Sequence, residues 1–79
     1  MKRIKVSLGD GVSAYATVWA AMDTIEALYR VYYVRNPFDE WEDIQASEKL
    51  DEIEKWLKKA LEQNKPSHRK VADFTIYVN

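Results

Sequence analysis

The stretch from Ile4 to Trp19 reads IKVSLGDGVSAYATVW and decides the fold. Apolar and polar side chains alternate on both sides of a glycine pair, and a period of two is the pattern of a strand. We place Gly9, Asp10 and Gly11 in a three-residue loop, because glycine at the last loop position takes a left-handed backbone at little cost. The stretch therefore predicts a β-hairpin in which Leu8 lies opposite Val12.

This register assigns a face to every side chain of the hairpin. The face expected to be buried receives Ile4, Val6, Leu8, Val12, Ala14 and Ala16, and the other receives Lys5, Ser7, Ser13, Tyr15, Thr17 and Trp19. A second interpretation stays open, in which a long helix begins at Ser13, since Tyr15 and Val18 continue the helical spacing of the residues that follow. The hairpin is favoured because β-branched residues recur between Val12 and Val18.

Three helical segments and one more strand follow. The spacing predicts helices over 20–35, 37–45 and 48–63 and a strand over 71–78. Asp23 or Thr24 is the expected cap of the first helix. Asn36 and Ser47 are the expected caps of the second and third. We expect a break near Ala46-Ser47, because its two sides differ in apolar phase. The residues before it are Phe38, Trp41 and Ile44, and the inner stripe after it contains Leu50, Ile53 and Leu57.

These elements predict a single α+β domain over residues 1–79. Its expected architecture is a three-stranded, mainly antiparallel sheet, made of the hairpin and the C-terminal strand, with two to three helices packed on one face. The order of elements is β-β-α-(α)-α-β. A core of this size gives little net stability without a further staple, and the sequence contains no cysteine. We therefore expect a homodimer or a bound partner protein.

Composition and motifs argue against several classes of function. One histidine and no cysteine leave no common type of zinc site, and we expect neither metal nor cofactor. His68 lies in the polar stretch NKPSHRK, where we expect it to face solvent, so we expect no catalytic residue and no enzyme. The apolar span 12–34 contains Asp23, Glu26 and Arg30, which argues against a membrane helix. Because Met1-Lys2-Arg3 leads directly into a strand, we expect no secretory leader and a cytoplasmic location.

The first candidate binding site is an acidic group around a tryptophan. It consists of Asp39, Glu40, Trp41, Glu42 and Asp43. The wider segment 39–54 has eight acidic residues against Lys49 alone. Such runs are often solvated helix faces, but carboxylates rimmed by aromatic rings also imitate a phosphate backbone. We expect a protein-binding module, with an inhibitor of nucleic-acid-handling machinery, of the kind mobile elements or phages direct against host defence, as its specific form.

The second candidate site is the outward face of the sheet. The register places Tyr15, Trp19 and Tyr77 there together with Arg3 and Lys5. Tyrosine, tryptophan and arginine are the usual anchors of protein interfaces. Rings flanked by cations also stack on bases and neutralise phosphates of single-stranded nucleic acid, which is one alternative function. A structural self-assembling subunit is the other alternative. The third interpretation is that these rings are ordinary strand residues, half-buried by their neighbours.

Overall fold

The structure is a computed structural model that describes residues 3–79. Met1 and Lys2, on which the argument about a leader partly depends, lie outside the described residues. The elements in chain order are β1 (Ile4–Leu8), β2 (Gly11–Tyr15), α1 (Val18–Tyr33), α2 (Glu40–Glu62), β3 (Ser67–Val71) and β4 (Phe74–Val78).

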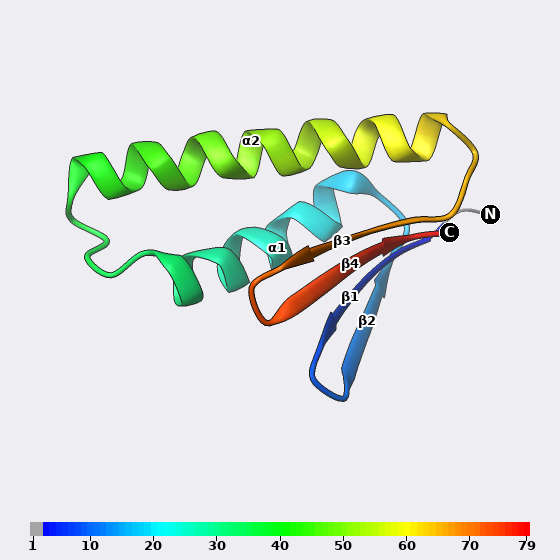
Figure 1. Ribbon diagram of the computed structural model, residues 1–79, viewed down its shortest axis with the longest axis horizontal. Coiled ribbons are helices and arrows are strands. Elements are labelled where there is room, and N and C mark those ends of the chain that lie inside the picture. The colour runs from blue at the N-terminus through cyan, green and yellow to red at the C-terminus, as the bar shows by residue number, and fades with distance from the viewer. Residues whose placement is uncertain (1–2) are drawn as a thin grey trace.

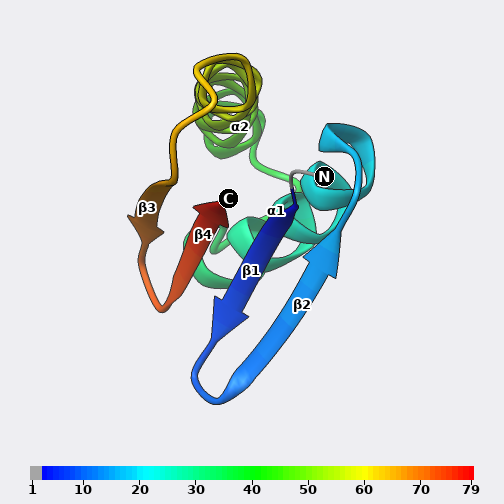
Figure 2. The ribbon, with the colours of Figure 1, turned by 90° about the vertical axis from the view of Figure 1, so that its right-hand side faces the viewer.

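The four strands form one antiparallel sheet in the order β2-β1-β4-β3. Both helices lie on the same side of this sheet and leave its other side uncovered (Figures 1 and 2). The expected α+β class and antiparallel sheet are confirmed. The prediction of three strands and two to three helices was wrong, because residues 3–79 form four strands and two helices, in the order β-β-α-α-β-β.

The register of the first hairpin differs from the expected one by one residue. The loop holds two residues, Gly9 and Asp10, so that Leu8 pairs with Gly11 rather than with Val12. Gly9 has a φ of 58° while Asp10 keeps a negative φ, which is the pattern of the type II′ turn that suits two-residue hairpins. Since a slip of one residue exchanges the two faces of a strand, every side chain of β2 points to the face opposite the expected one.

The first helix begins earlier than expected. Thr17 is the N-cap of α1, and its hydroxyl accepts a hydrogen bond of 3.1 Å from the backbone N–H of Ala20. The expected caps Asp23 and Thr24 therefore lie inside the helix, and a start at Ser13 is equally wrong. Trp19, expected on a strand, stands in the first turn of α1.

The second helix is continuous where a break was expected. Asp39, rather than Asn36, is its N-cap and accepts hydrogen bonds from the N–H groups of Trp41 and Glu42. Asn36 instead accepts from the N–H of Phe38 in the turn before the helix. Ala46-Ser47 lies inside α2 without interruption. The residues before Ala46 lie beyond the edge of the sheet, so their apolar phase need not match that of the buried part.

The additional strand is β3, which the sequence presents as a polar loop. It pairs with β4 through a second two-residue loop, Ala72-Asp73, in which Ala72 has a φ of 49°. His68 belongs to this strand and is exposed, as expected. The final strand begins at Phe74 rather than at residue 71.

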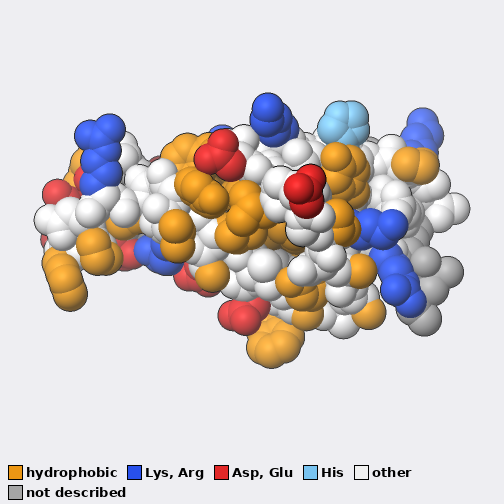
Figure 3. Space-filling view, turned by 90° about the horizontal axis from the view of Figure 1, so that it is seen from below, with side chains coloured by type: hydrophobic (Ala, Val, Ile, Leu, Met, Phe, Trp, Pro, Cys, Tyr) orange, Lys and Arg blue, Asp and Glu red, His pale blue; other side chains and the backbone are white. Residues whose placement is uncertain are grey.

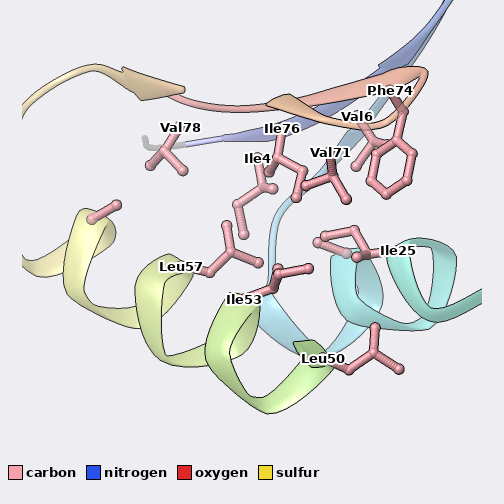
Figure 4. Close-up of a cluster of buried hydrophobic side chains, with 12 residues drawn as sticks. Ile4, Val6, Ile25, Leu50, Ile53, Leu57, Val71, Phe74, Ile76 and Val78 are labelled. Carbon is pink, nitrogen blue, oxygen red and sulfur yellow. The ribbon is translucent and has the colours of Figure 1, made fainter. Parts of the chain in front are cut away.

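The core lies between the inner face of the sheet and the two helices (Figure 4). The sheet contributes Ile4, Val6, Val71, Phe74, Ile76 and Val78, and the helices contribute Ala21, Ile25, Leu50, Ile53, Leu57 and Ala60. Burial of Phe74, Ile76 and Val78 on one face of the last strand confirms its expected alternation.

One ion pair ties α2 to the edge of the sheet. The guanidinium of Arg69 on β3 donates to the carboxylate of Glu52 at 2.8 Å. This hydrogen bond, with the nearby charge of Lys49, lowers the pKa of Glu52 below its ordinary value. The guanidinium of Arg69 also lies 6.0 Å from the centre of the Trp56 ring. Glu52 and Trp56 therefore both hold this charged side chain on the inner face of β3.

Candidate functional site

The α1–α2 hairpin extends beyond the sheet (Figure 1). Several apolar side chains near this end of the hairpin are exposed. We call this group the helical tip. Its members are Val31, Tyr32, Tyr33, Phe38, Trp41 and Ile44. Phe38 is 95% exposed and Trp41 is 66% exposed, so neither contributes much to the core. Hydrophobic side chains project at this end of the molecule, on the left of Figure 3.

A hollow lies between the two helices at the base of the helical tip. Its volume is about 290 Å³, and its lining residues are Tyr29, Tyr33, Val34, Arg35, Glu42, Gln45 and Ala46. The rings of Tyr29 and Tyr33 stack along one wall with their centroids 4.4 Å apart. Burial, with the neighbouring Tyr33 and Glu52, raises the pKa of Tyr29. The hollow therefore has one aromatic wall, and Arg35 and Glu42 add charged groups to its lining.

Three of the four acidic residues expected to bind a partner have structural partners within the chain. Asp39 caps α2. One carboxylate oxygen of Glu42 accepts from the backbone N–H groups of Arg35 and Asn36, at 2.9 and 2.8 Å. Asp43 accepts a hydrogen bond of 3.0 Å from the guanidinium of Arg30. This hydrogen bond, together with a second one to Glu26, raises the pKa of Arg30.

Glu40 is the member of the acidic group for which the described residues show no such partner. All four carboxylates also lie at the N-terminus of α2, where they stabilise the helix by opposing its dipole. Tyr33 stacks on Tyr29, but the described residues show no comparable side-chain contact for the exposed rings of Phe38 and Trp41, so these two rings are the better indication of a binding site.

Replacing Glu42 by alanine is expected to loosen the turn between the helices. The two N–H groups of Arg35 and Asn36 lose a charged acceptor, which we expect to cost about 1–2 kcal/mol because water replaces it in part. Urea denaturation should show this loss, and amide hydrogen exchange should show faster exchange at both residues. Replacing the exposed Glu48 on the same helix is the control, expected to change stability by less than about 0.5 kcal/mol. Unchanged exchange at Arg35 and Asn36 would contradict the role of Glu42.

The three aromatic residues expected on one sheet face lie in three different places. Tyr15 faces the helices, and the hydroxyl of Thr24 donates to its oxygen at 2.8 Å. Trp19 is 81% exposed on the first turn of α1. Tyr77 keeps its expected place on the uncovered sheet face. The shared aromatic surface was a wrong prediction with two physical causes: the one-residue shift of β2 turns Tyr15 to the helices, and the early start of α1 takes Trp19 off the sheet.

The uncovered sheet face is basic rather than aromatic. The register places His68, Tyr77, Lys5 and Ala14 in one row across the strands, and Lys70, Thr75, Ser7 and Val12 in the next. The rings of His68 and Tyr77 lie 6.2 Å apart at 33°. Among these described residues Tyr77 is the single large aromatic ring, whereas a stacking platform for single-stranded nucleic acid needs several.

Sequence reasoning missed most of the helical tip. Trp41 was identified as a binding residue, but Val31, Tyr32, Tyr33, Phe38 and Ile44 were not. A signal was present, since the first helix is apolar on more than one side and one sheet face cannot cover both. The second apolar stripe of the first helix therefore indicated an apolar surface that the sheet does not cover.

Within residues 3–79, no group of three or more histidine, aspartate and glutamate side chains is arranged to hold a metal ion. Neither described helix has the length and apolarity needed to cross a membrane. Comparison with protein-family models finds no match, and neither the curated proteins nor the solved structures contain one that is significantly similar.

Proposed function

We propose that this chain is a non-enzymatic protein-binding module whose helical tip docks on another protein. The observation that carries the proposal is the high exposure of Phe38 and Trp41 together with four further exposed apolar residues near the same end of the helical hairpin. Several exposed apolar residues in one region mark interaction sites, because single exposed apolar residues are common but groups of them are not. Tryptophan and tyrosine are also the residue types that most often supply binding energy.

The charge around the helical tip indicates what kind of partner surface would bind there. Acidic residues dominate 39–54, while Lys55 begins a segment in which bases dominate to Lys70. A partner that joins an apolar groove to a basic rim would be steered towards the acidic end of α2. A basic nucleic-acid-binding protein fits this description, and occupying its groove would inhibit it. Glu40 is the carboxylate best placed to contribute, because the other three are engaged within the chain.

Photo-cross-linking tests this proposal in cells that express the protein. A photoreactive phenylalanine analogue replaces Phe38, and the control carries the same analogue at Trp19, which is similarly exposed but lies at the other end of α1. We expect an adduct with one protein from position 38 only, attached to a surface that is apolar with basic residues around it. A Glu40→Lys variant should then associate more slowly with that purified protein, with a weaker dependence on salt.

Three outcomes would overturn the proposal. Equal adducts from both positions would show that exposure alone determines the reaction. An adduct with nucleic acid would favour the alternative function on the uncovered sheet face. An adduct between two copies of this chain would make the helical tip a self-association surface rather than a site for a different partner.

A further inference from the structure

The two edges of the sheet differ in how they are protected from pairing with another strand. The β3 edge carries His68, Arg69 and Lys70 and follows Pro66, which are devices that block edge-to-edge association. The β2 edge is Gly11–Tyr15, with the sequence GVSAY and no charged residue or proline. Its first four residues are exposed. One edge is therefore protected and the other is open.

We infer that two copies of this chain associate through β2, with the two β2 strands antiparallel about a two-fold axis at Ser13. The two sheets would then form one continuous sheet with a β3 strand at each outer edge. This self-association uses a surface separate from the helical tip and does not depend on the proposed function.

The backbone of β2 suits this pairing. Hydrogen-bonded and non-hydrogen-bonded pairs alternate along an antiparallel ladder, and a two-residue loop closes on a hydrogen-bonded pair. Leu8 and Gly11 form that closing pair, so Val12 and Ala14 direct their N–H and C=O groups away from β1. With the axis at Ser13, Val12 of one copy lies opposite Ala14 of the second copy. All of these outward groups then find partners.

The side chains of β2 are complementary to those of a second β2 strand. On the uncovered face Val12 meets the small Ala14 of the second copy. On the helix-facing side Tyr15 lies opposite Gly11 of the second copy, so the largest side chain of the strand meets the residue that has none. A hollow of about 240 Å³ adjoins Gly11, lined by Val6, Leu8, Gly11, Ser13, Thr24 and Leu28. This large-to-small pairing on both faces favours a second copy over an unrelated strand.

The side chains of α1 beside β2 determine how closely a second copy can approach the open edge. Thr24 and Leu28 are the α1 residues beside the hollow. Helical spacing places Ala20 and Ala27 on the same flank as Thr24, so the flank of α1 next to the open edge carries small side chains.

Disulfide formation tests the position of the axis. Two Ser13 residues on the axis form a non-hydrogen-bonded pair with Cα atoms about 4.5 Å apart, a separation that a disulfide spans. Because the natural sequence has no cysteine, Ser13→Cys introduces a single thiol. Ser47→Cys on α2, also an exposed serine, is the matched control. Under mild oxidation at low protein concentration we expect a covalent dimer from Ser13→Cys at least tenfold faster than from Ser47→Cys. Equal rates would overturn the inference.

Sedimentation of the cysteine-free protein provides the second test. The natural chain should change from mostly monomer to mostly dimer as its concentration rises through about a hundredfold range. Val12→Lys should shift this dimerisation to at least tenfold higher concentration, because a lysine opposite Ala14 of the second copy puts a charge on the paired edge, and charged edge residues oppose strand pairing. Ile44→Lys, which places the same charge on the helical tip, should leave it unchanged. A strict monomer, or a dimer lost in Ile44→Lys but kept in Val12→Lys, would overturn the inference; circular dichroism of both variants excludes a failure to fold.

Discussion

Replacing Phe74 by alanine is expected to leave most of the protein unfolded at room temperature. Phe74 is fully buried at the start of β4, where it pairs with Leu8 on β1 and Val71 on β3. Truncating such a phenylalanine costs about 3–5 kcal/mol, counting both the lost transfer free energy and the cavity. A domain of this size without disulfides rarely exceeds about 3–5 kcal/mol of net stability. One substitution therefore removes most of the available margin.

The measurement is urea denaturation followed by circular dichroism, with a Tyr77→Ala variant as the control. Tyr77 lies on the same strand but faces the uncovered side and is 40% exposed. We expect the Tyr77 variant to lose no more than about 1 kcal/mol. A cooperative transition of Phe74→Ala with a midpoint close to that of the natural protein would show that the core is not organised around this ring.

The central part of this core could be predicted from sequence because its strands alternate strictly. Ile4 and Val6 on β1 and the apolar residues of β4 were assigned to the buried face, and all of them are buried. The helical spacing of Ile53 and Leu57 identified the inner stripe of α2 in the same way. These assignments succeed because a strong period fixes the face of a side chain without knowledge of its neighbours.

The register of β2 could not be read with the same certainty. Two glycines flank Asp10, so a loop of two or three residues satisfies the turn chemistry equally well. Val12 and Ala14 alternate with Ser13 and Tyr15, and hydrophobicity alone favours the wrong pair for the core. An edge strand that buries little surface gives no strong penalty to correct that choice, and the assignment of Tyr15 failed with it; the assignment of Trp19 failed because α1 begins at Val18.

The strand that the sequence analysis did not predict is β3, because the charged residues that protect this edge of the sheet are typical of a loop. Arg69 faces the interior side of the sheet but carries a charge, which Glu52 and the Trp56 ring satisfy. Its hairpin turn uses Ala72 at a positive φ, where glycine or asparagine would have marked the turn. The local sequence therefore resembles a loop, and only the pairing with β4 makes it a strand.

The helical tip presents the opposite situation, because its apolar residues follow no pattern of burial. Phe38, Trp41 and Ile44 were interpreted as a short helix out of phase with the next one. Within residues 3–79 these three side chains stay largely exposed, so burial does not fix their phase, and the backbone of α2 continues through them without a break. A mismatch of this kind indicates a surface available to another molecule rather than a break in the helix.

Replacing Trp41 by alanine is expected to weaken binding of the partner protein identified by cross-linking by about 30-fold or more. An aromatic anchor at the centre of an interface contributes about 2 kcal/mol or more, which corresponds to that change in Kd. The stability of the chain should change by less than about 0.5 kcal/mol, since the ring is mostly exposed and the cap of α2 is supplied by Asp39. Calorimetric titration with the purified partner gives the first value, and urea denaturation gives the second.

Trp19→Ala is the matched control, because it removes the same ring from an even more exposed position on α1. Its Kd should stay within about twofold of that of the natural protein. Loss of affinity in both variants would place the interface along α1 instead of at the helical tip, and loss in neither would remove the helical tip as a binding site. Reversing the charge of the whole acidic group is a weaker test, since Asp39 and Glu42 hold the turn and the start of α2. A Trp41 variant separates binding from folding because its side chain contributes to the surface and scarcely to the core.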